Sequence, residues 1–160
     1  MKGQKLPSTQ AVRVLRTAAV AFEVHPYDYR DGGGTAQVAQ ALGVDEHLVI
    51  KTLIMEDDKG GPMIVLMHGD RQVSTQALAR AIGAKRVTPC EPRTADRHSG
   101  YQVGGTSPFG TRRAMPVYCE SDIATLPRIY INGGRRGLIV SMDTADALRL
   151  LSPILVRISA

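Results

Sequence analysis

Apolar and polar residues follow one another along this chain in two patterns, one typical of helices and one typical of strands. Four segments repeat apolar residues at the spacing of a helix face, each preceded by a candidate N-cap residue. These predicted helices start at Ser8 or Thr9, at Thr35, at Ser74, and at Asp143 and Thr144. Short apolar runs predict strands over residues 22–27, 48–55, 63–67, 86–88, 116–119, 129–132 and 137–142, and 91–98 reads as a polar helical turn. Helices interleaved with strands predict an α/β protein.

The turn residues indicate how the strands connect. The cluster 57–61 separates the apolar runs 48–55 and 63–67, which predicts a β-hairpin at the centre of a sheet. Pro26 cannot donate to a strand ladder, so we expect it at a sheet edge or a strand end. Short strands punctuated by glycine favour a mixed sheet that curls into a barrel-like shape. No repeat or linker divides the sequence, so residues 1–160 are expected to form a single domain.

The segment 101–110 combines a short β-like run, 101–103, with Gly104-Gly105 and Ser107-Pro108. Adjacent glycines allow a positive φ and remove the Cβ atoms that would keep a ligand away from the backbone. Backbone N–H groups of such a loop can bind a carbonyl or phosphate oxygen, as in an oxyanion hole. An ordinary surface turn uses the same residue types, and the pattern taken alone favours that interpretation.

Lys51 interrupts the predicted strand 48–55, between Ile50 and Thr52-Leu53. Lysine is rarely buried without a partner because removing an ammonium group from water is costly. Strand alternation can send Lys51 to solvent. It can equally place the lysine at the floor of a pocket that holds an anionic or carbonyl group.

The 160 residues carry a net charge of +5, with basic pairs at Lys85-Arg86, Arg112-Arg113 and Arg135-Arg136. This charge favours a polyanionic partner, although a solvated basic face explains each pair equally well. No apolar run approaches the roughly 18 residues of a membrane span, and the N-terminus lacks the apolar core of a leader. We therefore expect a cytoplasmic protein with no membrane partner.

The two cysteines, Cys90 and Cys119, stand apart, and no histidine lies at ligand spacing from either. A zinc site is therefore not expected, and a disulfide is disfavoured in a reducing compartment. We expect no metal, no disulfide and no cofactor.

Four motifs follow one another along the chain: the run Val49-Ile-Lys-Thr-Leu53, then 76–85, 100–110 and 129–138. Together they resemble the YbaK family of aminoacyl-tRNA deacylases, which is related to the editing domain inserted in bacterial prolyl-tRNA synthetases. The resemblance covers about residues 12 to 150. It implies a curled mixed sheet flanked by helices, and hydrolysis of the ester that joins an amino acid to tRNA.

The resemblance also implies roles for individual residues. Lys51 matches the family's central lysine and Gly104 the glycine of its substrate loop, so Lys51, Gly104 and Gly105 are the predicted catalytic group. Lys51 would anchor the terminal phosphate or polarise the ester, and the two glycine N–H groups would stabilise the oxyanion. The predicted substrate-binding residues are Tyr27, Thr52, Ser107, Pro108, Asn132 and Ile139. The residues expected to contact tRNA phosphates are Arg112, Arg113, Arg135 and Arg136.

Three positions depart from the best-known family members: Gly34 stands in place of Phe, Asn132 in place of Ser, and Ile139 in place of Asp. These positions form pocket walls, so the resemblance specifies the reaction more closely than the amino acid. Cys-tRNA(Pro) is the first expected substrate. The alternatives are Ala, Ser or Thr on tRNA, or a non-catalytic module that binds tRNA or a synthetase. The expected partner is aminoacylated tRNA, with prolyl-tRNA synthetase a second candidate and no DNA.

Overall fold

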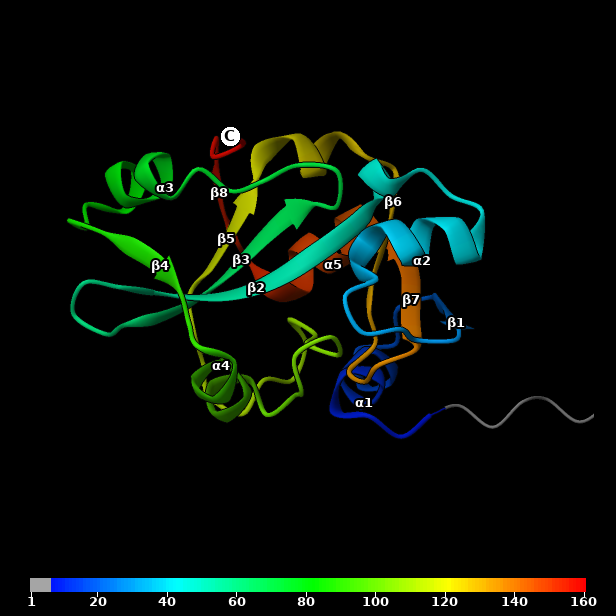
Figure 1. Ribbon diagram of the computed structural model, residues 1–160. Coiled ribbons are helices and arrows are strands. Elements are labelled where there is room, and N and C mark those ends of the chain that lie inside the picture. Colours follow the sequence, from blue (N-terminus) through cyan, green and yellow to red (C-terminus); the bar gives the residue numbers. More distant parts are fainter. Residues whose placement is uncertain (1–6) are drawn as a thin grey trace, which may run out of the picture.

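The computed structural model describes residues 7–160, whose eight strands form one mixed sheet (Figure 1). The α-helices are α1 (Gln10–Thr17), α2 (Gly34–Leu42), α3 (Thr75–Ile82), α4 (Pro92–Ser99) and α5 (Thr144–Leu151), and the 3₁₀ helices are η1 (Glu46–Leu48) and η2 (Ser121–Thr125). The strands are β1 (Phe22–Pro26), β2 (Val49–Asp57), β3 (Pro62–His68), β4 (Val87–Pro89), β5 (Val117–Glu120), β6 (Arg128–Asn132), β7 (Leu138–Asp143) and β8 (Ile154–Val156).

The strands follow the order β1-β7-β6-β2-β3-β5-β8, and β4 pairs with β2 outside this path. β2 and β3 form the antiparallel hairpin that the turn cluster predicts, whereas β2–β6, β3–β5 and β5–β8 are parallel pairs. The prediction of a mixed sheet is confirmed. The sheet is not closed into a barrel, because β1 and β8 stand at opposite ends of the order and the described residues include no pairing between them.

Helices cover both faces of this sheet. One face packs against α1, α4 and α5, whose Leu15, Ala95 and Ala147 belong to one apolar cluster. The other face packs against α3 through Leu78 and against α2 through Val38. β2 contributes to both sides because successive residues of a strand point to opposite faces. Within residues 7–160, no helix has the length and apolar character needed to cross a membrane.

Most predicted elements are present, with three local corrections. Thr35 is not an N-cap, since α2 begins at Gly34 and the Thr35 hydroxyl donates to the Glu46 carboxylate at 2.7 Å. Residues 101–103 form bends and turns instead of a strand. A further short strand, β8, follows the proline that ends α5. Pro26 lies in the edge strand β1, as predicted.

Candidate active site

The sheet has a gap along one edge of β2. The other edge pairs with β3 from Ile50 to Glu56. On the gapped edge, β6 pairs only with Val49 and Ile50, and β4 pairs only with residues 55–57 (Figure 1). One further bond, from the Cys90 N–H to the Ile54 carbonyl at 3.0 Å, extends the β4 side. Residues 51–53 therefore have no strand beside them on this edge.

Glycine and proline create this gap. β6 ends at Asn132, where Gly133 and Gly134 begin the turn into β7, and Gly134 has a φ of +102° that favours glycine. On the other side β4 ends at Pro89, and Pro92 begins α4. Because proline suits the first turn of a helix, the chain leaves the sheet here.

A cavity of about 500 Å³ follows the gap. Every residue from Val49 to Met55 contributes to its wall, which an intact sheet would not allow. Six predicted site residues line it: Tyr27, Lys51, Thr52, Gly104, Asn132 and Ile139. Gly105, Ser107, Pro108 and the four predicted tRNA-binding arginines are not part of its wall. The structure thus brings together the strand lysine, the loop glycine and all but two of the predicted substrate-binding residues.

Lys51 is half-buried in this cavity. Burial lowers the pKa of its ammonium, and the charges of Glu46 and Asp70 only partly offset that effect. Within residues 7–160, no carboxylate lies within ion-pair distance of Lys51. A partly desolvated cation without an ion-pair partner favours the binding of an anionic or carbonyl oxygen.

The predicted oxyanion loop contributes one free N–H group instead of two. In the turn 102–105, the Gly105 N–H already donates to the Gln102 carbonyl at 2.7 Å, so it is not available to an oxyanion. Gly104 has a φ of +92°, and its N–H makes no hydrogen bond to residues 7–160. Gly105 is needed for packing, because a Cβ there would lie 2.6 Å from the backbone of Arg135.

The turn between β6 and β7 holds this loop in place. The Asn132 side-chain amide donates to the Gly104 carbonyl at 3.2 Å, and Arg136 Nε donates to the Val103 carbonyl at 3.0 Å. The Arg136 guanidinium also lies over the Tyr29 ring, 5.1 Å from its centre. Arg136 therefore supports the loop; its side chain is exposed, and its contact with tRNA stays a prediction.

Tyr29 is a cavity residue that the sequence analysis missed. Its hydroxyl lies so close to Gly104 that a Cβ on this glycine would be 2.5 Å from the oxygen. The sequence did carry a signal for Tyr29. It lies two residues after Tyr27, and side chains at this spacing in an extended segment point to the same side.

Ser107 and Pro108 lie beneath the loop and away from the cavity wall. Both are buried, and the Ser107 hydroxyl accepts the Phe109 N–H at 3.1 Å. The Tyr101 hydroxyl donates to the Phe109 carbonyl from the core side. These contacts fix the base of the loop, so the Ser-Pro pair acts as a support.

Tyr27 and Ile139 form the apolar wall next to α2. Ile139 is 3% exposed and packs in one cluster with Val38 and Val49. Burial raises the pKa of the Tyr27 hydroxyl. Gly34, at the start of α2, lines the same wall, and no atom lies within 4 Å of the position that a Cβ would take. The cavity is therefore open on the side where the family resemblance leads one to expect a phenylalanine.

Arg112 and Arg113 are exposed next to the C-terminus of α4. Their backbone N–H groups donate to the carbonyls of Ser99 and His98 at 2.9 and 3.0 Å. Burial, followed by the charges of Arg113 and Arg97, lowers the pKa of His98, which indicates a positive potential on this surface. Within residues 7–160, neither Arg112 nor Arg113 forms an ion pair.

One group of possible metal ligands occurs among residues 7–160, formed by His47, His68 and Asp70. The two imidazole rings are stacked, with 3.7 Å between centres and 6° between planes. The lone pair of a ring nitrogen lies in the ring plane, so two parallel rings cannot both direct one toward a single ion. His47 Nδ1 also interacts with Asp70 at 2.9 Å. We interpret the group as a stacked structural pair.

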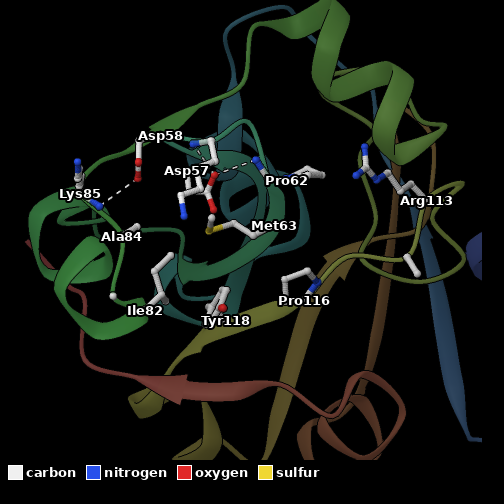
Figure 2. A pocket seen from close by; sticks show the side chains of 14 residues that line it. Asp57, Asp58, Pro62, Met63, Ile82, Ala84, Lys85, Arg113, Pro116 and Tyr118 are labelled. Carbon is white, nitrogen blue, oxygen red and sulfur yellow. Dashed lines mark hydrogen bonds between the residues drawn. The ribbon is translucent and has the colours of Figure 1, made fainter.

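A second cavity, of about 480 Å³, lies between the tip of the β2–β3 hairpin and the end of α3 (Figure 2). Its two carboxylates already accept local backbone hydrogen bonds: Asp57 from Lys59 and Gly61, and Asp58 from Lys85. Arg113 is the one predicted site residue in its wall. Both carboxylates therefore serve to hold the hairpin tip and the end of α3.

The three-layer fold and the gapped-sheet cavity match one class of protein. The family model of the aminoacyl-tRNA editing domain covers residues 31–150, and the chain belongs to this family. Aminoacyl-tRNA deacylases, which are ester hydrolases, are the enzymes of this class. The matched range includes Lys51, Gly104 and Asn132 but not Tyr27 and Tyr29.

Several relatives are similar in sequence or fold. A proposed Cys-tRNA(Pro)/Cys-tRNA(Cys) deacylase, EbsC of Enterococcus faecalis, is 26% identical over 143 residues, which are 89% of this chain and 87% of that protein. A proline–tRNA ligase of Nitratidesulfovibrio vulgaris is 27% identical over 69% of this chain, but the match spans only 17% of the ligase. The crystal structure of a proposed trans-editing enzyme for prolyl-tRNA synthetase superposes with a TM-score of 0.82 at 20% identity, covering 97% of this chain and 99% of that one.

Proposed function

We propose that this protein hydrolyses the ester bond of mischarged aminoacyl-tRNA in trans, with Cys-tRNA(Pro) as its first substrate. The observation that carries the proposal is the meeting of Lys51 and Gly104 in one cavity, at the edge of β2 that no strand covers. The name of the Enterococcus faecalis relative supports the choice of substrate at 26% identity.

In the proposed reaction, Lys51 binds the phosphate of the terminal nucleotide or polarises the ester carbonyl. The Gly104 N–H stabilises the oxyanion that develops when the ester is attacked, an interaction worth on the order of 3 kcal/mol per donor. When water attacks, the free amino acid leaves and the tRNA hydroxyl is restored in one step. When a ribose hydroxyl or the substrate's own side chain attacks, the acyl group first moves to that oxygen or sulfur, and water then hydrolyses the new bond to release the amino acid.

The apolar wall supports a small neutral amino acid. Ile139, with Val38 and Val49 behind it, offers no polar partner for a substrate side chain. Apolar pockets distinguish substrates by only roughly 1–3 kcal/mol per methylene and reject an added hydroxyl poorly. Alanine, serine and threonine on tRNA are therefore the alternatives to cysteine, and a non-catalytic tRNA-binding module is the alternative from a different class.

The test is deacylation of a panel of tRNAs charged with Cys, Ala, Ser, Thr and Pro. We expect the highest kcat/KM with Cys-tRNA(Pro) and measurable turnover of Ala-tRNA. Ile139→Ala widens the pocket without burying a charge. It should reduce the differences in kcat/KM between these amino acids. Tight binding of tRNA without hydrolysis of any ester would favour the non-catalytic module.

The proposal includes cytoplasmic tRNA as the partner, held through Arg112, Arg113 and Arg135, whose side chains are exposed. Prolyl-tRNA synthetase is the proposed protein partner, because trans-editing of Cys-tRNA(Pro) acts on the product of that synthetase. Co-sedimentation of the purified protein with the synthetase, with and without tRNA, tests this part separately.

A further inference from the structure

The unpaired edge of β2 has a definite orientation at Thr52. The backbone N–H and C=O of a strand residue point to the same side, and they alternate between the two sides along the strand. The Val49 carbonyl accepts the Gly69 N–H on the β3 side, whereas the Ile54 carbonyl accepts the Cys90 N–H on the β4 side. By this alternation, the N–H and C=O of Thr52 both point into the gap.

Neither group has a partner among residues 7–160. The register between β2 and β6 stops at Ile50 and Ile131, one residue short of the pairing that would bring the Asn132 carbonyl to the Thr52 N–H. The Asn132 side chain instead donates to the Gly104 carbonyl. The Thr52 hydroxyl is also buried without a hydrogen-bond partner. Buried polar groups in proteins are nearly always hydrogen-bonded, so the buried hydroxyl, together with the unpaired backbone groups of the same residue, points to a ligand.

An aminoacyl group is the complement of such an edge. Its α-ammonium is a hydrogen-bond donor and its ester carbonyl is an acceptor. A residue of an antiparallel strand likewise offers one donor and one acceptor to the neighbouring strand. We propose that the aminoacyl group pairs with Thr52 as a strand of one residue. The Thr52 carbonyl accepts a hydrogen bond from the α-ammonium, and the Thr52 N–H donates to the ester carbonyl oxygen.

This pairing assigns a substrate class and rests on the proposed function. The site recognises esters of amino acids whose α-amine is free and charged. A peptidyl or N-acylated aminoacyl ester has lost the ammonium and carries bulk where the Thr52 carbonyl must approach. Such tRNAs are poor substrates, so the enzyme leaves tRNAs that carry a growing peptide intact.

The experiment uses the full chain and the tRNA that it deacylates fastest, prepared in three forms: with the free amino acid, with its N-acetyl derivative, and with the α-hydroxy acid of the same side chain. Each rate is divided by the uncatalysed hydrolysis rate of the same ester. We expect about a tenfold or larger loss in kcat/KM for the N-acetyl form. We also expect about a tenfold loss for the α-hydroxy form, because a charged hydrogen bond becomes a neutral one.

Two variants separate the backbone groups from the side chain. Thr52→Pro removes the N–H that faces the gap and breaks no bond to β3, and it should lower kcat on the free aminoacyl ester by about 10²-fold in a protein whose melting temperature shows that it is folded. Thr52→Val removes only the hydroxyl and should keep the discrimination against the N-acetyl ester.

The outcomes are distinct. Equal normalised kcat/KM for the three esters overturns the pairing and leaves the proposed function standing. A slow N-acetyl ester combined with a full-rate α-hydroxy ester also overturns it, because that result shows steric exclusion alone. No acceleration of any ester by the wild type overturns both the proposed function and the pairing.

Discussion

The Lys51 ammonium is more costly to keep charged in the folded protein than in water, because burial lowers its pKa by more than the Glu46 and Asp70 charges raise it. Residues that serve a site often lower stability in this way. We predict that Lys51→Met unfolds at a higher temperature than the wild type at pH 7. The matched control Lys59→Met, at an exposed turn, should leave the melting temperature unchanged.

The burial of the Lys51 ammonium also makes the free energy of unfolding depend on pH. Because the folded pKa of Lys51 lies below the unfolded value, the unfolded chain binds more protons between these two values, and stability rises with pH there. This part of the rise should be missing in Lys51→Met. An identical slope in both proteins would show that Lys51 is not desolvated.

Gly104 is constrained by its backbone angle and by the Tyr29 hydroxyl. Gly104→Ala should lower kcat/KM by about 10²-fold, because both constraints would displace the N–H that we propose stabilises the oxyanion. Gly83→Ala is the matched control: Gly83 has a φ of +75°, but no atom lies within 4 Å of an added Cβ. It should lose similar backbone stability, roughly 1 kcal/mol, with unchanged kcat/KM. Equal losses of activity in both would contradict a local role for Gly104.

At the scale of single elements, most helices and strands were predictable because their signals are local. Ser74 caps the N-terminus of α3 and Gly83 ends the helix, and the turn 57–61 connects the two strands of the β2–β3 hairpin. The gap in β2 was not predictable, since β6 and β4 come from segments far apart in the chain and only their registers define it. The short strand β8 was missed because three residues after a proline carry little pattern.

Glu120 fixes the C-terminal segment that includes β8. Glu120 is 3% exposed, and its carboxylate accepts the N–H groups of Ile158 and Ser159 at 2.8 and 2.9 Å. Burial alone would raise the pKa of Glu120, but these hydrogen bonds bring it below its usual value. Its stabilising contribution is therefore complete above the unfolded pKa and is lost as the pH falls through the folded pKa.

Glu120→Gln should lower the free energy of unfolding at pH 7 by about 1–3 kcal/mol and flatten its fall toward acid pH. Denaturant unfolding at several pH values measures both effects. Glu91→Gln is the control, because Glu91 is exposed and makes no capping hydrogen bond. If Glu120→Gln retained the full acid dependence, other carboxylates would have to produce it.

At the scale of the whole molecule, the exposed arginines differ in their contacts, which the sequence could not show. The Arg136 side chain contacts Val103 and Tyr29, whereas those of Arg112 and Arg113 make no ion pair within residues 7–160. This difference in contacts arises because the turn that carries Arg136 packs against the loop that carries Val103. For the same reason, the open sheet could not be separated from a closed barrel by strand lengths alone.

We predict that tRNA affinity falls with salt and that replacing both Arg112 and Arg113 by Ala flattens the log–log slope by roughly one per lost phosphate contact. Filter binding from low to high salt measures this slope. Arg136→Ala should instead lower kcat while changing the slope little. A slope unchanged by the Arg112 and Arg113 replacement would place the tRNA surface elsewhere.

The proposed hydrolysis of an aminoacyl-tRNA ester takes place in the cavity at the open edge of β2 and depends on Lys51. The most direct measurement is the single-turnover rate of Cys-tRNA(Pro) deacylation by the wild type, Lys51→Met and Lys59→Met. We expect acceleration by the wild type, a loss of about 10²-fold or more in folded Lys51→Met, and no loss in Lys59→Met. A wild-type rate in Lys51→Met would show that Lys51 takes no part in the hydrolysis.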